Sequence, residues 1–155
     1  MPKVAVVIPV YKENLNEFEK ISLAQCRTVL KNYPLIFAAP AGKIFSYFEN
    51  NDLIAHFPDK FFKDTKTYNR LMMSPLFYEP FLDFDYILIY QLDAFVFYDA
   101  LGFFCDLNYD YIGAPVAYHS WYGYKYKNKV PRVGNGGFSL RKVKNCYQLL
   151  KECSV

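Results

Sequence analysis

Short, continuous apolar runs alternate with longer amphipathic stretches along the chain. The runs at 4–10, 33–40 and 86–97 contain few polar residues and are rich in β-branched and aromatic side chains. This pattern is typical of strands that are covered on both faces, as in a parallel sheet. Shorter runs at 53–58 and 109–116 predict two further strands.

Between these runs, apolar residues recur at helical spacing. The stretch 13–33 predicts a helix with Asn14 or Asn16 as its N-cap. Further helices are expected at 42–51, at 66–81 with a kink or an early end at its prolines, from about Asp99 onward, and after a glycine-rich turn near the C-terminus. Strands that alternate with helices predict an α/β fold with a largely parallel sheet.

Length and composition narrow the class of protein. The chain has 155 residues, 53% of them hydrophobic, which predicts one domain spanning 1–155. The formal net charge is +3 with basic residues spread along the chain, so nucleic acid is not an expected partner. The four cysteines form no CxxC pair, which argues against a zinc site and favours free buried thiols.

Two features of the chain bear on its location and extent. No apolar run approaches the roughly 20 residues of a membrane span, and no secretion signal is present at the start. We therefore expect no transmembrane segment and a cytoplasmic protein, free or peripheral at the inner membrane. The sequence stops inside an apparent helix, which predicts a C-terminally truncated or shortened member of its type.

Asp93 is the first candidate for chemistry. It lies in the segment "YILIYQLDAFVF", where a single carboxylate follows a buried strand. Ligands of open α/β sheets collect at the carboxyl ends of the strands, so Asp93 stands at the functional edge. It either binds a divalent cation or caps a turn, and position alone favours neither. Asp83 and Asp85 precede the strand and are expected to be solvated turn residues.

Three other segments could contribute to a site. The glycine-rich "VGNGGFSLR", with Asn135, would let backbone approach a ligand closely or would form a tight turn. Tyr11, Lys12 and Glu13 follow the first strand, where the tyrosine ring could stack on a base or belong to an ordinary surface loop. The polar and aromatic loop 117–129 offers rings for sugar contacts, although these rings could equally pack on one another.

Several motifs together resemble a known family. The segments "VAVVIPVYKE", "YNRLMMS", "YILIYQLDAFVF", "YDYIGAPV" and "VGNGGFSLRK" occur in this order. They resemble an uncharacterised bacterial glycosyltransferase-like family with the GT-A fold, the fold of nucleotide-diphospho-sugar transferases. The resemblance covers nearly the whole chain. It implies a Rossmann-like, three-layer architecture in which helices flank a mostly parallel central sheet.

The resemblance also implies a site. Transferases of this fold typically carry an Asp-x-Asp motif that binds a metal ion and the sugar nucleotide, and "QLD" occupies that place here. Asp93 matches the final Asp and would hold Mn²⁺ or Mg²⁺, whereas Gln91 stands in place of the first. The residues implied to bind the nucleotide sugar are Tyr11, Glu13, Asn69, Arg70, Gln91, Asp93, Asn135, Gly136 and Gly137.

The function implied is transfer of a sugar from a nucleotide-diphosphate sugar to a glycan or cell-envelope acceptor. The loss of one acidic ligand at Gln91 puts the dependence on metal in question. An alternative is a catalytically inactive or truncated module that binds a nucleotide or a glycan. A nucleotidyltransferase is less favoured, because no glycine-rich, basic loop follows the first strand. The resemblance assigns no catalytic base.

Overall fold

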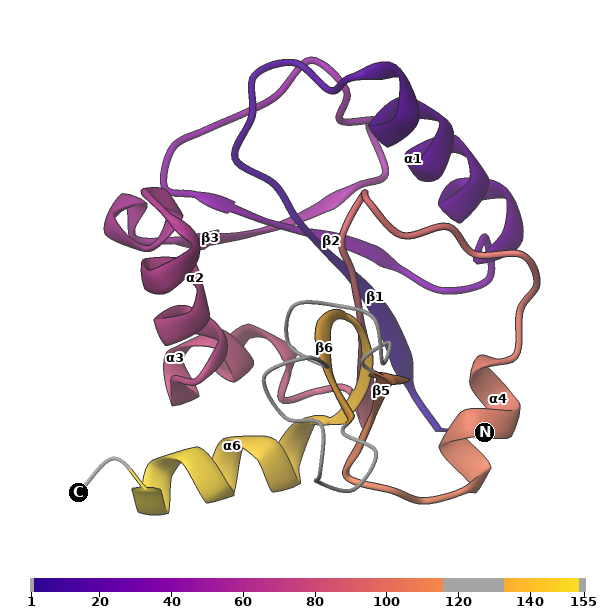
Figure 1. The fold of residues 1–155 in the computed structure, drawn as a ribbon, viewed down its shortest axis with the longest axis vertical. Helices are drawn as coiled ribbons and strands as arrows, with labels where there is room; N and C mark the ends of the chain where they lie inside the picture. The colour runs from indigo at the N-terminus through magenta and orange to yellow at the C-terminus, as the bar shows by residue number, and fades with distance from the viewer. Residues whose placement is uncertain (1, 116–132, 154–155) are drawn as a thin grey trace, which may run out of the picture.

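The structure is a computed structural model and describes residues 2–115 and 133–153. Its centre is a six-stranded sheet with the order β3-β2-β1-β4-β6-β5 (Figure 1). The strands are β1 Val4–Pro9, β2 Leu35–Pro40, β3 Leu53–Phe57, β4 Tyr86–Tyr90, β5 Tyr111–Pro115 and β6 Val133–Lys142. The pairs β2–β3, β1–β2 and β1–β4 are parallel, whereas β6 is antiparallel to both of its neighbours. The prediction of a largely parallel sheet is confirmed.

Helices cover both faces of the sheet (Figure 1). The helices are α1 Glu17–Val29, α2 Thr65–Met72, α3 Pro75–Tyr78, α4 Leu101–Asp106 and α6 Val143–Cys153. Buried residues of α1 and α4 pack on one face, and those of α2, α3 and α6 pack on the other. Within 2–115 and 133–153, none of these helices is long and apolar enough to cross a membrane.

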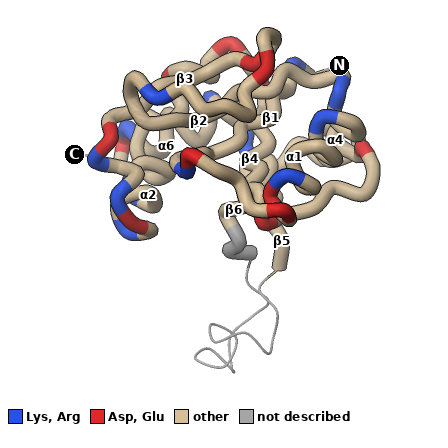
Figure 2. Tube along the Cα trace, turned by 90° about the horizontal axis from the view of Figure 1, so that it is seen from above, with Lys and Arg blue, Asp and Glu red and all other residues tan. Residues whose placement is uncertain are grey.

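The apolar runs form the core because alternate residues of each strand enter opposite layers. In β1, Val6 and Ile8 contact the layer of α1, whereas Ala5 and Val7 contact the layer of α2 and α3. Charged residues lie mainly on the helices and loops around the sheet, and β1, β2 and β4 contain none (Figure 2). A strand buried on both faces therefore needs the continuous apolar run that the sequence displays.

Capping residues fix where the helices start. Asn16 accepts a hydrogen bond from the Glu19 amide at 2.9 Å, and Glu19 returns one to the Asn16 amide, so a capping box begins α1 as expected. Asp64 caps α2 through the Thr67 amide at 2.7 Å. The predicted helix 66–81 is divided, because Ser74 and the proline after it begin a new helix, α3.

Three expectations about the elements are wrong. The stretch 42–51 is not a helix but a series of turns, in which Phe45, Tyr47 and Phe48 pack with Phe37 of β2. Of the apolar run 86–97, only Tyr86–Tyr90 forms a strand, because a turn closed by the Ala94 backbone amide on the Gln91 backbone carbonyl at 2.9 Å follows it; Asp93 lies after the strand, as expected. Aromatic packing and a local turn decide these boundaries, and neither is encoded in apolar periodicity.

The third correction concerns the glycine-rich segment. Residues 134–137 do not form a turn but belong to β6, which lies between β4 and β5. Irregular pairing near Ala114 shifts the register between β5 and β6 in this part of the strand. The sequence indicated a turn because glycine is depleted in strands, yet the pairing here is decided by neighbours distant in the chain.

Candidate functional site

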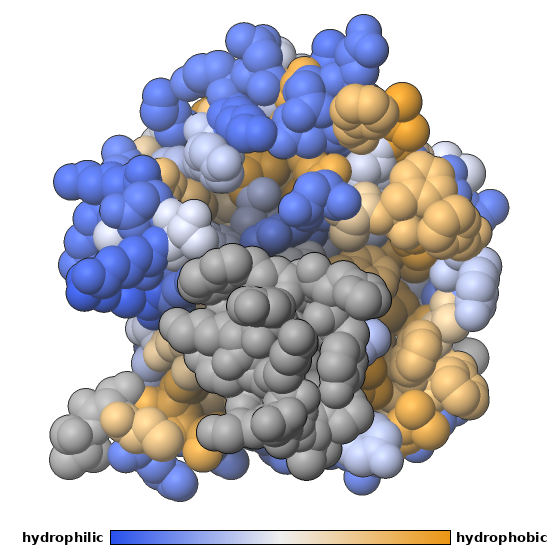
Figure 3. Space-filling model, viewed as in Figure 1, coloured by the Kyte–Doolittle hydropathy of each residue, from blue (hydrophilic) through white to orange (hydrophobic). Residues whose placement is uncertain are grey.

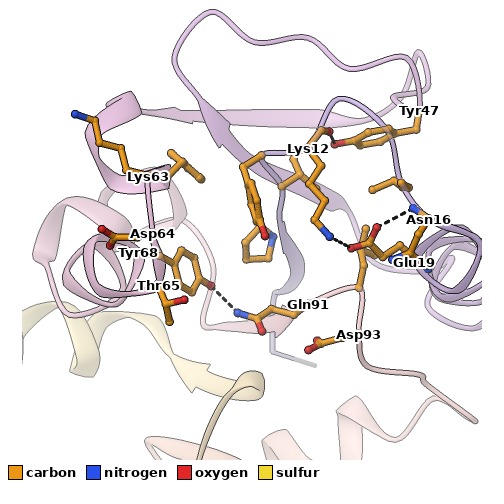
Figure 4. A pocket seen from close by; sticks show the side chains of 16 residues that line it. Lys12, Asn16, Glu19, Tyr47, Lys63, Asp64, Thr65, Tyr68, Gln91 and Asp93 are labelled. Carbon is orange, nitrogen blue, oxygen red and sulfur yellow. Dashed lines mark hydrogen bonds and ion pairs between the residues drawn. The ribbon is translucent and has the colours of Figure 1, made fainter.

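A cleft of about 570 Å³ opens at the carboxyl ends of β1 and β4. Its walls come from the end of β1 and the loop after it, the first turn of α1, the start of α2 and the residues that follow β4 (Figure 4). The surface is hollowed here, next to the hydrophilic residues over α2 (Figure 3). The cleft thus lies where open α/β sheets bind ligands.

An ion pair crosses the wall formed by β1 and α1. The Lys12 ammonium donates a hydrogen bond to the Glu19 carboxylate at 2.5 Å, and the Tyr47 hydroxyl donates to the Lys12 carbonyl at 2.9 Å. The hydrogen bond with Glu19 raises the pKa of Lys12. Burial acts to raise the pKa of Glu19, but the bonds from Lys12 and Asn16 lower it overall. Both groups are therefore charged at neutral pH and fix the loop between β1 and α1.

Tyr68 of α2 meets Gln91 at the opposite wall (Figure 4). The Gln91 side-chain amide donates a hydrogen bond to the Tyr68 hydroxyl at 3.2 Å. Burial raises the pKa of Tyr68, although Gln91 and the charge of Arg141 oppose the shift. The hydroxyl therefore keeps its proton at neutral pH and can donate a hydrogen bond to a ligand in the cleft. The side-chain carbonyl oxygen of Gln91 can accept a hydrogen bond or coordinate a cation.

Asp93 lies in the turn after β4 and lines the cleft beside Gln91 (Figure 4). Its side chain is exposed, so the cost of burying a carboxylate does not arise. Among the described residues, no amide caps it and no cation pairs with it. The turn-capping alternative is therefore wrong for the described part of the chain, and the Asp93 carboxylate is free to contact a ligand or an ion.

The donor set around Asp93 is small. The described residues contain no group of three or more His, Cys, Asp or Glu side chains able to enclose a metal ion. The Asp93 carboxylate and the side-chain carbonyl of Gln91 supply oxygen ligands, which Mg²⁺ and Mn²⁺ prefer. These residues fit a cation that completes its coordination with phosphate oxygens and water, and they do not fit a cage made by the protein alone.

The other residues implied by the resemblance divide into two groups. Tyr11 lines the cleft with its ring 60% exposed. Glu13 is outside the lining and pairs with Lys43 at 3.0 Å. Asn69 and Arg70 are exposed on α2, also outside the lining. The structure therefore gathers Tyr11, Gln91 and Asp93 and leaves the other three outside.

The glycine-rich part of β6 lies outside the cleft lining, next to the end of β4. Asn135 is paired with Ala114 of β5 through its backbone. The Gly137 carbonyl accepts a hydrogen bond from the Gln91 amide at 2.8 Å, which ties β6 to the end of β4. A Cβ added at Gly136 would lie 3.1 Å from the Arg141 guanidinium, so a larger residue here would press on that side chain.

Sequence reasoning missed Glu19, Tyr68 and Arg141. Leu71 and Met72 are buried, and Tyr68 lies three positions before Leu71 and four before Met72, on the same face of the helix. The phase of α2 therefore points Tyr68 inward and leaves Asn69 and Arg70 exposed. The capping box at Asn16 similarly indicated Glu19. No neighbouring residue in the sequence indicates that Arg141 is buried, because the residues around it are brought there by strand pairing. The aromatic loop lies outside the described residues.

A second cavity of about 430 Å³ lies on the face of the sheet covered by α1 and α4, between the β4–α4 connection and β5–β6. Its lining contains Phe95, Phe97 and Phe104 and no Lys, Arg, Asp or Glu side chain. It therefore offers no charged group to a phosphate or a metal ion. The chemistry of the described residues is concentrated in the first cleft.

Comparison with solved structures supports a glycosyltransferase-like fold. The chain is similar to the mannosyltransferase Ktr4p from S. cerevisiae, whose X-ray structure contains GDP, with a TM-score of 0.53 and 11% identity. The similarity covers 99% of this chain but 62% of that chain, so the protein spans less than two thirds of the length of this neighbour. No curated protein matches the sequence.

A family model also matches the sequence, over residues 53–155. This range includes the wall of the cleft formed by α2 and the end of β4, as well as the glycine-rich strand β6. Because the match covers most of the chain, the protein belongs to the family described as "Protein of unknown function (DUF5672)".

Proposed function

We propose that the protein is a GT-A glycosyltransferase that moves a sugar from a nucleotide-diphosphate donor to a hydroxyl of a glycan or cell-envelope precursor. One observation carries the proposal: the cleft at the carboxyl edge of the sheet gathers Tyr11, Gln91 and Asp93. The similarity to a mannosyltransferase that holds GDP adds support at the level of the fold.

Different residues of the cleft suit different parts of such a donor. The exposed ring of Tyr11 offers a face on which a nucleobase can stack. The Tyr68 hydroxyl and the side-chain carbonyl of Gln91 can bind polar groups of the ligand, and the Asp93 carboxylate can hold a cation. A divalent cation bound there would neutralise charge on the leaving diphosphate.

Cation binding should depend on the nucleotide. Asp93 and Gln91 provide too few oxygens to enclose Mn²⁺ alone, so phosphate oxygens and water would complete the coordination. Affinity for Mn²⁺ should therefore be weak in the free protein and rise when the nucleotide is present. Isothermal titration of Mn²⁺ with and without the nucleotide measures this difference directly.

The first experiment is thermal unfolding with UDP, GDP, CMP and dTDP sugars, each with and without Mn²⁺. A ligand at about 100 times its dissociation constant stabilises the native state by about 2.7 kcal/mol. In a chain of this size that corresponds to a rise in Tm of roughly 5–10 °C. GDP-mannose is the first donor to test, because the neighbouring mannosyltransferase holds GDP.

Replacement of Asp93 tests the residue assignment. In Asp93→Ala we expect the Mn²⁺-dependent part of the thermal shift, and the rate of sugar transfer, to be lost. The matched control is Asp83→Ala, which removes an exposed carboxylate beside the opposite end of β4. An Asp93→Ala protein that transfers sugar at the wild-type rate contradicts the assigned role.

The second candidate is a module that binds a sugar nucleotide without turnover, and Gln91 in place of an acidic residue favours it. The two functions differ in one observable. A transferase releases the nucleoside diphosphate from the sugar nucleotide, whereas a binding module returns the ligand intact. Chromatography of the ligand after prolonged incubation with glycan acceptors separates them.

A further inference from the structure

Arg141 is a buried cation without an acidic partner. It lies on β6 and is only 6% exposed. Its Nε donates to Ser139 Oγ at 3.0 Å, Nη1 to Tyr78 Oη at 2.8 Å and Nη2 to the Gly136 carbonyl at 3.3 Å. All three acceptors are neutral, so hydrogen bonds satisfy the guanidinium without cancelling its charge.

No carboxylate in the described ranges lies within ion-pair distance of Arg141. Nor can the segment 116–132 provide one, since it contains no Asp or Glu but four Lys or Arg residues, Lys125, Lys127, Lys129 and Arg132. Arginine does not lose its proton in proteins. The positive charge is therefore buried, with a desolvation cost that an apolar side chain would avoid.

Arg141 lies directly behind one wall of the cleft. Its side chain faces the layer of α2 and α3, because it is paired with Ile87 across β4 and bonds to Tyr78 of α3. The backbone at Gly136 accepts its hydrogen bond, and the next carbonyl, of Gly137, accepts the Gln91 amide. A short chain of contacts thus connects the buried guanidinium to the β4 end of the cleft.

The field of Arg141 reaches the cleft. Its charge acts to lower the pKa of Tyr68, whose hydroxyl lines the cleft and bonds to Gln91. Along the cleft itself, Lys12 is paired with Glu19, so its charge is largely cancelled. The cleft lining also contains Lys63 and the Asp93 carboxylate, and the negative charge of Asp93 acts to raise the pKa of Tyr68. The positive charge of Arg141 behind the wall opposes that negative charge and favours an anionic group beside Gln91 and Tyr68.

We propose that Arg141 is a positioning residue whose buried guanidinium, without touching the ligand, favours the diphosphate beside Gln91 and Tyr68 through its charge. The inference rests on the proposed nucleotide-sugar function and adds the orientation of the ligand. Arg70, which the sequence suggested for the diphosphate, is exposed outside the cleft lining.

The test compares ligands with and without the diphosphate. Titration calorimetry measures binding of a nucleoside, of its nucleoside diphosphate and of inorganic pyrophosphate to wild type, Arg141→Met and Arg141→Lys. Lys142→Met is the matched control, because it removes a charge from the next residue of β6. Two unit charges about 10 Å apart at an effective dielectric constant of about 20 change a dissociation constant by roughly tenfold.

We expect Arg141→Met to lose the preference for diphosphate over nucleoside by roughly tenfold. Nucleoside affinity should not change, and Arg141→Lys and Lys142→Met should keep the preference. The result that overturns the proposal is an equal loss in the Met and Lys variants, or an equal loss for nucleoside and diphosphate. Either result would mean that Arg141 only stabilises β6 through its hydrogen bonds.

A wild-type measurement covers the case in which the variants fail to fold. In protein labelled with ¹⁵N-arginine, pyrophosphate and the nucleoside diphosphate should shift the Arg141 Nε–H resonance, and the nucleoside should not. If pyrophosphate shifts it but no nucleotide binds, Arg141 keeps its role and the nucleotide-sugar function fails. If nucleotides bind without shifting it, the function stands and the inference about Arg141 is overturned.

Discussion

Replacement of Glu19 with glutamine separates two roles of one side chain. Glu19 accepts hydrogen bonds from Lys12 at 2.5 Å and from the Asn16 amide at 2.9 Å. Glutamine can keep the bond from Asn16, because capping boxes accept Glu or Gln, but it cannot pair with an ammonium group as an ion. Glu19→Gln therefore removes the ion pair at the cleft wall and retains the start of α1.

The expected loss of stability follows from burial. The side chain of Lys12 is 40% exposed and that of Glu19 is 16% exposed. Exposed ion pairs contribute about 0.2–1 kcal/mol, and the burial of Glu19 puts this pair near the upper end, so we expect a loss of about 1 kcal/mol. That corresponds to a fall in Tm of roughly 3 °C, measured by calorimetry at pH 7.

The pH dependence carries a definite sign. The folded pKa of Glu19 is lowered below its ordinary value of 4.5, so its contribution is present above pH 4.5 and disappears as pH falls through the folded pKa. The Tm difference between wild type and Glu19→Gln should therefore shrink on acidification. Glu17→Gln is the control, since Glu17 is exposed in the same turn. Equal losses in both variants, or a difference that persists unchanged at low pH, would refute the reasoning.

Three further predictions concern stability, binding and reactivity. Asp52→Asn should lower the free energy of unfolding in urea by about 2 kcal/mol, because Asp52 pairs with Arg27 through two bonds of 2.7 Å and is 4% exposed. An unchanged urea midpoint contradicts this. Tyr68→Phe should cost about 1 kcal/mol in urea and weaken nucleotide binding in calorimetry, and wild-type affinity would contradict its place in the site. In folded protein at pH 8, a thiol reagent should modify exposed Cys153 and spare Cys26, whose pKa burial raises to about 12; rapid reaction of Cys26 would be the contrary result.

The sequence predicted those elements whose signal is local. The runs that became β1, β2 and β4 are recognisable because strands buried on both faces need unbroken apolar residues. The start of α1 was expected at Asn14 or Asn16 because a cap is indicated by neighbouring residues, and Asn16 is the cap. The strand β6 was not predicted, since its partners β4 and β5 lie far back in the chain and its glycines suggested a turn.

The same division applies to the site. Tyr11 and Asp93 could be placed at the cleft because the rule for carboxyl ends of strands depends on sequence position alone, whereas Gln91 was implied by the resemblance. Asn69 and Arg70 were suggested by a motif, and the phase of α2 turns both away from the cleft lining. Arg141 could not be found without strand pairing, which decides what surrounds it.

The position of β6 also sets the order in which the sheet can be completed during synthesis. The ribosome makes β5 before β6, yet β5 joins the sheet through β6. Until residue 142 has emerged, β4 therefore presents an open edge of unpaired amides and carbonyls, and β5 has no neighbour. Nascent chains that stop before this point should be the ones that chaperones retain or that aggregate, whereas longer chains can close the edge themselves.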